Sequence, residues 1–143
     1  MHRLLALLLV AGAAFAADSA AEEGAHKAMD NFMTTFNSRD VNAWAASLNF
    51  PHVRFASNTV RVFPNQADFI RDSKDYVAAL GAWDHSAWQE MKVVQSGPDK
   101  VHFSVVFVRY DKSGKVIGTF PSLYIATLLN GHWGVQGRSS YAP

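Results

Sequence analysis

The sequence lacks cysteine altogether, and its charges nearly cancel. Without a thiol, the 143-residue chain has no disulfide framework, no cysteine nucleophile and no cysteine-ligated zinc. Thirteen Lys and Arg residues against twelve Asp and Glu leave a net charge of +1, which is too small for an electrostatic nucleic-acid binder. Charged residues make up only 17% of the chain and apolar residues 49%, so the composition is that of one folded domain and not of a disordered segment.

Several motifs that carry chemistry are also missing. The sequence contains no G-x-S-x-G nucleophile turn, no P-loop and no G-x-G-x-x-G dinucleotide motif. The histidines show no H-x-x-x-H or H-E-x-x-H spacing and no cluster of two histidines with one carboxylate. We therefore expect neither a metal ion nor a bound cofactor.

The N-terminal residues are typical of a secretory signal peptide. Arg3 precedes an apolar run that is shorter than the roughly 20 helical residues needed to span a bilayer. An A-x-A cleavage site ends at Ala16. We expect residues 1–16 to be removed, which leaves a single domain over residues 17–143 that is periplasmic or secreted and not bound to a membrane. An N-terminal membrane anchor or a surface helix is the alternative.

Hydrophobic periodicity predicts helices first and the main sheet afterwards. Three helices are expected: one with its apolar stripe over residues 25–36, a short helix from residue 41 that Pro51 ends, and one that Asn65 begins and that runs to about residue 80. Ser38 or Asp40 can cap the second helix, and Asn65 the third. Strands are expected where apolar residues alternate, over residues 52–56, 59–63, 85–95, 101–110, 116–129 and 132–141. Helices gathered on one side of an antiparallel sheet make the fold class α+β.

Three motifs accompany this order of elements. They are the break Asn37-Ser38-Arg39-Asp40 followed by Trp44, the hairpin and helix over residues 52–80, and the closing run Gly131-His132-Trp133-Gly134-Val135 with Gly114 before it and Ser139-Ser140 after it. Together they resemble the nuclear transport factor 2-like superfamily, which includes the SnoaL-like polyketide cyclases and the ketosteroid isomerases. The resemblance covers about residues 25–141.

The resemblance implies a cone-shaped, strongly curved antiparallel sheet wrapped around the N-terminal helices, the cystatin-like or SnoaL-like α+β barrel. It also implies an apolar pocket at the open end of the cone. Members of the superfamily frequently dimerise through the outer sheet face, so we expect a homodimer.

The steroid-isomerase mechanism finds no support in the residues. In ketosteroid isomerases the general base is an Asp in the segment after the second helix, and residues 50–56 here contain no carboxylate. The oxyanion donors of that enzyme include a protonated Asp, whereas the only acid over residues 101–141 is Asp111, in a predicted turn. The motifs therefore predict the fold better than the activity.

Two groups of residues could act on a ligand in the cone. His52 and Arg54 lie two apart on a strand and leave the same face, so His52 could act as a base and Arg54 could hold a carboxylate or enolate. The alternatives are a pair at the rim or a salt bridge from Arg54 to a helix acid. Trp83, His85 and Trp88 could bind a planar ligand; alternatively Trp83 plugs the helix–sheet junction and His85 faces water.

Polar residues also interrupt the apolar strands, among them Arg109, Tyr124 and Arg138. Counting back from the predicted hairpin turn at Asn130-Gly131 places Arg138 opposite Leu123. Tyr124 and Arg138 then point to opposite faces unless a bulge intervenes. Arg138 is left with two interpretations, a role in the pocket or a place on the outer face.

These observations predict, first, an exported protein that binds a small apolar or aromatic molecule in the cone. The alternatives are an isomerase, cyclase or dehydratase that uses a histidine as acid or base in the same pocket, and a dimeric interaction module whose cavity is filled. The candidate catalytic residues are His52, Arg54 and His85. The candidate ligand-binding residues are Phe32, Phe36, Trp44, Phe55, Trp83, Trp88, Tyr124 and Arg138.

Overall fold

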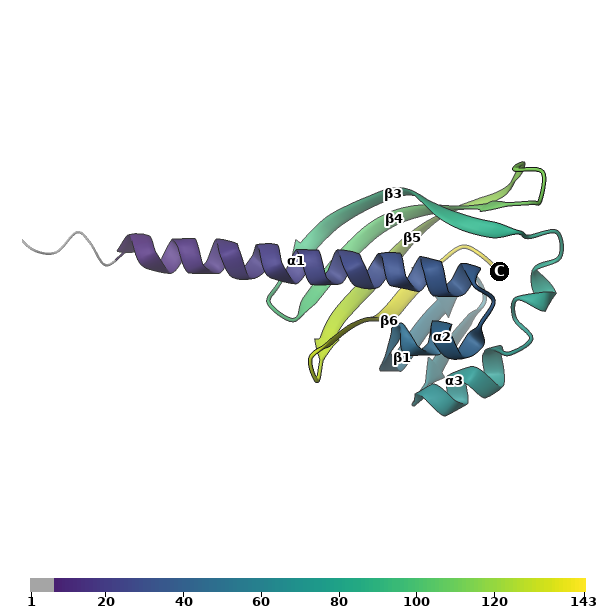
Figure 1. Cartoon of the computed structure of the whole chain (residues 1–143), viewed down its shortest axis with the longest axis horizontal. Coiled ribbons are helices and arrows are strands. Elements are labelled where there is room, and N and C mark those ends of the chain that lie inside the picture. Colours follow the sequence, from purple (N-terminus) through teal and green to yellow (C-terminus); the bar gives the residue numbers. More distant parts are fainter. Residues whose placement is uncertain (1–6) are drawn as a thin grey trace, which may run out of the picture.

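The computed structural model describes residues 7–143, with side chains from Ser19 onward (Figure 1). The predicted signal peptide over residues 1–16 falls outside the residues whose side chains are described, and it stays a prediction. Within the described part of the chain, no helix is both long enough and apolar enough to span a membrane.

Helices come first and the long strands last, in the predicted order. The elements are α1 (Leu7–Asn37), α2 (Val41–Ala46), β1 (Leu48–Ala56), β2 (Thr59–Phe63), α3 (Gln66–Ser73), the short 3₁₀ helix η1 (Ala78–Leu80), β3 (His85–Ser96), β4 (Lys100–Tyr110), β5 (Val116–Leu129) and β6 (His132–Ser140). Asp40 caps α2 by accepting from the backbone N–H groups of Asn42 and Ala43, and Asn65 caps α3 by accepting from the N–H of Asp68. Of the two caps predicted for the second helix, Asp40 is the one found, and the cap predicted at Asn65 is confirmed.

Two predicted helix ends are wrong. Pro51 lies inside β1 and does not end α2, because Ser47 already closes the helix through the bond from its N–H to the Ala43 carbonyl. The third helix ends at Ser73 instead of residue 80, and turns and η1 take the place of its last two turns. There the N–H of Tyr76 donates to the Ser73 carbonyl, which is the tighter spacing of a turn. This early end carries Tyr76 to the cavity described below.

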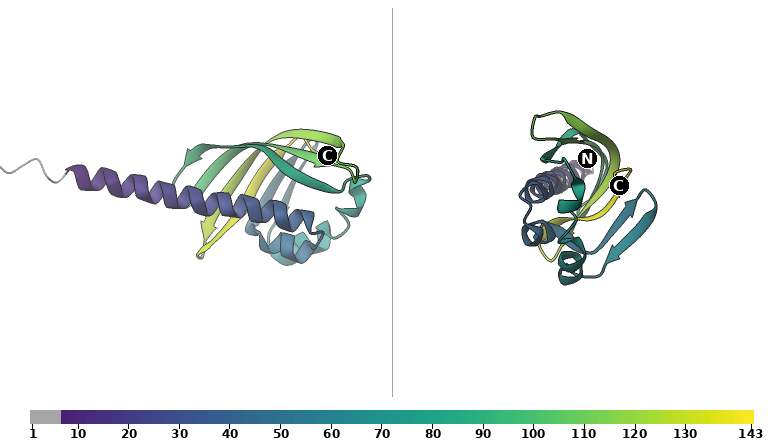
Figure 2. Two further views of the ribbon diagram at one scale, coloured as in Figure 1. Left: turned by 45° about the horizontal axis from the view of Figure 1, so that its top comes forward. Right: turned by 90° about the vertical axis from the view of Figure 1, so that its right-hand side faces the viewer.

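The six strands form one open, curved sheet in the order β2-β1-β6-β5-β4-β3. All neighbours are antiparallel except β1 and β6, which run parallel, so the prediction of a fully antiparallel sheet is wrong at this one pair. The β1–β2 hairpin pairs through β1 with the free edge of β6, the last strand. The long stretch of chain between β1 and β6 allows these two strands to run in the same direction. Seen end-on, the sheet curls around α1 (Figure 2). The architecture is α+β, as predicted.

The apolar stripe of α1 forms the core inside this curve. Ala25, Met29 and Phe32 are buried and pack in one cluster with Phe103 of β4 and Tyr124 of β5. The rings of Phe32 and Tyr124 lie 5.5 Å apart, edge to face, and connect the helix to the sheet. Burial of this stripe stabilises the helix against the sheet more than helix propensity does.

A β-bulge in β6 decides which face Tyr124 and Arg138 share. Pairing between β5 and β6 follows the predicted count from the hairpin turn as far as Ala126 and then shifts by one residue, with Gln136 as the extra residue. Tyr124 therefore pairs with Arg138. Both side chains contact the ring of Phe32 on the concave side of the sheet, so the prediction of opposite faces is wrong.

Candidate functional site

A small cavity lies inside the cone, beside the C-terminal end of α1. Its volume is about 20 Å³, which is room for about one water molecule. The apolar lining is Phe32, Met33, Phe36, Phe107 and Ala142, and the polar lining is Arg54, Tyr76, Ser86, Arg109, Tyr124, Arg138 and Ser140. None of the described residues that line the cavity carries a carboxylate.

Three arginines, which we call the arginine cluster, face the cavity from three strands: Arg54 on β1, Arg109 on β4 and Arg138 on β6. Arg54 and Arg109 are each only 8% exposed, and the guanidinium of Arg138 lies over the rings of Phe32 and Trp44. In the described part of the chain, none of the three forms an ion pair with an Asp or Glu. Because a buried charge without a partner is unfavourable, the cluster is suited to bind an anion.

The contacts of the arginine cluster leave donors free for a ligand. Arg54 Nη2 donates to the carbonyl oxygens of Ala142, at 3.4 Å, and Pro143, at 3.0 Å. Arg109 Nη2 donates to the hydroxyl of Tyr76 at 3.2 Å, while its buried Nε meets no acceptor among the described residues. Since a guanidinium carries five N–H donors, these contacts satisfy only part of each side chain.

The positive charge of the cluster acts to lower the pKa of two tyrosine hydroxyls, Tyr76 and Tyr124, but it prevails over burial only at Tyr76. Burial raises the pKa of Tyr76, but the charges of Arg54, Arg109 and Arg138 outweigh burial and hold this pKa below its ordinary value. At Tyr124 burial prevails over the charge of Arg138 and raises the pKa. Tyr124 is therefore a neutral hydroxyl at pH 7, and Tyr76 is the more acidic of the two.

His52 positions Arg138. The ring is 0% exposed, with Nδ1 at 3.1 Å from the Val135 carbonyl oxygen and Nε2 at 3.2 Å from Arg138 Nε. Since the carbonyl can only accept, Nδ1 carries the proton, and Nε2 accepts from the guanidinium. Burial, aided by the charge of Arg138, lowers the pKa of His52 from 6.5 to about 3. A neutral ring with both nitrogens engaged does not fit the predicted role of general base, and His52 is a positioning residue.

Most of the other predicted site residues gather at the cavity. Phe32, Phe36, Arg54, Tyr124 and Arg138 line it. Trp44 and Trp88 lie directly behind this lining, since Trp44 stacks under the guanidinium of Arg138 and Trp88 meets the Tyr124 ring at 5.3 Å.

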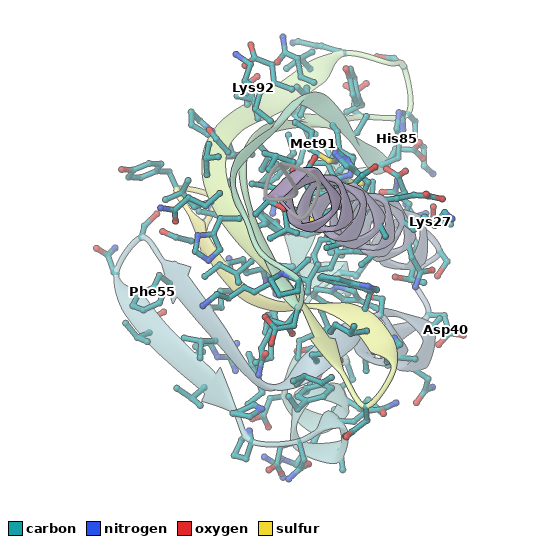
Figure 3. The ribbon with its side chains drawn as sticks, turned by 90° about the vertical axis from the view of Figure 1, so that its left-hand side faces the viewer. Lys27, Asp40, Phe55, His85, Met91 and Lys92 are labelled. Atoms are coloured by element: carbon teal, nitrogen blue, oxygen red, sulfur yellow. The ribbon has the colours of Figure 1, made fainter. Side chains whose placement is uncertain are left out.

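Three predicted site residues lie elsewhere. Trp83 is buried and donates from Nε1 to Ser86 Oγ, which matches the alternative of a plug at the helix–sheet junction. His85 is exposed and pairs with Asp84, away from the cavity lining. Phe55 is on the outer face of β1, because the strand alternation that turns its neighbour Arg54 inward turns Phe55 outward. Figure 3 shows Phe55 and His85 on opposite sides of the molecule. Neither histidine proposed as acid or base is therefore free to act in the cavity.

Sequence reasoning missed Tyr76 and Arg109 as members of this site. Tyr76 fits the apolar stripe of the predicted third helix, so nothing in the sequence separates it from a core residue. Arg109 did give a signal, because it interrupts an otherwise apolar strand. What was lacking was the strand register that brings it to Arg54 and Arg138.

The residues of the site are donors for an oxygen anion. Guanidinium and hydroxyl groups bind carboxylates and enolates through charge-assisted hydrogen bonds. Within the described residues, no three His, Cys, Asp or Glu side chains lie close enough together to hold a metal ion.

Comparison with known proteins places this geometry in a fold family. A family model described as NTF2-like protein (DUF6841) matches residues 21–142. No curated protein matches the sequence.

Solved structures of low sequence identity share the fold. A ketosteroid isomerase-like protein from Erwinia carotovora is 18% identical with a TM-score of 0.62, over 85% of this chain and 96% of that one. An NTF2-like protein with a cystatin-like fold from Novosphingobium aromaticivorans is 14% identical with a TM-score of 0.70, over 99% and 90% of the two chains. A protein from Catenulispora acidiphila, solved in complex with S-DNPA, is 8% identical with a TM-score of 0.68, over 86% and 93%. At these identities the likeness shows the fold alone.

Proposed function

The chain belongs to the NTF2-like family described as DUF6841, and we propose that its domain binds a small organic anion in the cone. The carboxylate or enolate of this ligand meets the arginine cluster, and its apolar or aromatic part meets the phenyl rings of the lining. From the signal peptide expected over residues 1–16, we propose that the protein acts in the periplasm or outside the cell.

The unpaired arginine cluster is the observation that carries this proposal. Arginines buried for structural reasons normally meet a carboxylate, because taking a guanidinium out of water is unfavourable by several kcal/mol unless the charge is compensated. Here Arg54, Arg109 and Arg138 converge on a cavity whose described lining has no acid. An anionic ligand would supply the missing negative charge and the missing acceptors together.

The aromatic lining supports a ligand with a flat or apolar body. Phe32, Phe36 and Phe107 surround the same cavity as the guanidinium groups. Pockets that combine apolar walls with a few convergent polar groups are typical of small-molecule sites. A structural neighbour that was solved in complex with S-DNPA also supports ligand binding as a use of this fold.

Benzoate should bind this protein at least about tenfold more tightly than benzyl alcohol, because a hydrogen bond to a charged group contributes roughly 1.5–3 kcal/mol. Quenching of tryptophan fluorescence can follow binding, since Trp88 lies 5.3 Å from the cavity-lining ring of Tyr124. Titration calorimetry provides the same constants without relying on that probe. Equal affinities for the acid and the alcohol, or no binding of benzoate, would contradict the proposal.

We also propose that the chain forms a homodimer through the outer face of the sheet. Phe55, Val60, Val62 and Leu123 are large apolar residues exposed on β1, β2 and β5, next to an open apolar groove of about 550 Å³. Contiguous apolar surface of this kind marks an interface. A second copy fits it, because in a two-fold dimer each copy presents the same apolar patch to the other.

Leu123→Lys should convert this dimer to a monomer, because it places a charge in the apolar contact of both copies. Sedimentation velocity measures the change, and circular dichroism verifies that the fold is kept. Val94→Lys is the matched control, since Val94 is equally exposed on β3 but does not line the groove. A natural chain that sediments as a monomer at micromolar concentration would rule the dimer out.

A further inference from the structure

The segment Tyr141–Pro143, which follows β6, closes the cavity. Ala142 is only 2% exposed and packs against Met33 of α1 and Phe107 of β4. In Figure 1 this end of the described chain lies near the C-terminal end of α1. The segment therefore places one small apolar side chain inside the cone, and the volume of about 20 Å³ is the space that remains beside it.

Main-chain oxygens of this segment accept from one member of the arginine cluster, Arg54. Arg54 Nη2 donates to the carbonyl of Pro143 at 3.0 Å and to that of Ala142 at 3.4 Å. The hydroxyl of Tyr76 donates to the Pro143 carbonyl at 3.3 Å. These are donors that a bound carboxylate would use, so the segment and an anionic ligand cannot both have them.

We propose that residues 141–143 are a displaceable plug, which an anionic ligand drives out of the cone when it binds. This inference rests on the proposed anion-binding function. Among the described contacts, the oxygens of the segment accept from Arg54 and from the hydroxyl of Tyr76. A ligand carboxylate can accept charge-assisted bonds from Arg109 as well as from Arg54, so the exchange favours the ligand. The apparent affinity is the intrinsic affinity multiplied by the fraction of molecules in which the plug is open.

The segment is held by contacts that can open without unfolding the sheet. Strand β6 ends at Ser140, so the residues that follow belong to no strand ladder. Tyr141 is 77% exposed, and its carbonyl accepts from Ser57 Oγ at 3.1 Å. The N–H of Ala142 donates to Ser140 Oγ at 3.0 Å. Short segments with few buried contacts are the parts of a protein that open at the lowest free energy.

Ala142→Arg tests the plug, because it puts a large cation among Met33, Phe107 and the arginine cluster and so expels the segment. The variant should bind benzoate about tenfold or more tightly than the natural chain, since no closed state competes. Tyr141→Arg is the matched control: it adds the same charge to the same segment at a solvent-exposed position and should leave the affinity unchanged. Calorimetry measures all three constants.

The natural chain offers a second measurement that does not depend on the variant. With saturating benzoate, the backbone amide signals of Tyr141 and Ala142 should move to random-coil positions and show the fast relaxation of a released segment. If benzoate binds while these amides stay ordered, or if Ala142→Arg and the natural chain bind it equally, the anion site stands and the plug is wrong. If no chain binds benzoate, the proposed function fails, and the plug fails with it.

Discussion

Arg109→Met should lower the affinity for benzoate by about 100-fold while leaving the free energy of unfolding unchanged or higher. The loss of affinity follows from a charge-assisted hydrogen bond, which contributes roughly 1.5–3 kcal/mol. The effect on stability follows from the absence of a carboxylate partner for Arg109 among the described residues. Its buried Nε also meets no acceptor there. Methionine keeps the packing on the rings of Phe107 and Phe120 and removes the buried charge.

Arg61→Met is the matched control for this variant. Arg61 also stacks on a phenylalanine ring, that of Phe63, at 5.1 Å, but it is exposed on β2 and does not line the cavity. Its replacement should change neither the benzoate affinity nor the stability by more than a few tenths of a kcal/mol. If Arg109→Met instead destabilises the domain by more than about 1 kcal/mol, Arg109 is a structural residue and the arginine cluster loses its functional interpretation.

The free energy of unfolding should fall steeply as the pH drops below 6.5, because His52 is neutral in the folded chain and becomes protonated when the chain unfolds. The pKa of His52 is lowered by burial to about 3 in the folded state, against 6.5 for the free side chain. Between these two values the unfolded chain binds one proton more, so stability rises with pH and is lost as pH falls. The slope is about 1.4 kcal/mol per pH unit, and the sum over the window is roughly 5 kcal/mol.

Urea unfolding at pH 7, 6 and 5 measures this slope. Asp and Glu side chains also titrate at the acidic end, so the informative quantity is the difference from His52→Gln. The Gln variant keeps a polar side chain of similar size beside Arg138 but removes the titrating ring. The natural chain should lose about 1.4 kcal/mol more per pH unit than the variant. Parallel curves would mean that the folded ring titrates near its ordinary pKa and that His52 does not sit neutral beside Arg138.

Local features of the fold were predictable from the sequence because they depend on neighbouring residues. The caps at Asp40 and Asn65 were found at their predicted positions, since capping needs only a side-chain oxygen and the next three backbone N–H groups. The hairpin at Asn130-Gly131 has the positive φ angles, 51° and 77°, that this pair of residues favours. The alternation of β1 likewise placed His52 and Arg54 on one face without any knowledge of the sheet.

The site itself was decided by contacts between residues far apart in the chain. Arg54, Arg109 and Arg138 meet only because β1 joins β6 in parallel and because the extra residue Gln136 shifts the pairing of β5 with β6. Tyr76 joins them because α3 ends early. A shift of one residue in the pairing register turns a side chain to the other face of the sheet. No local sequence pattern specifies where such a shift occurs. The sequence therefore determined the elements and the fold family, while the tertiary pairing decided that three positive charges share one cavity.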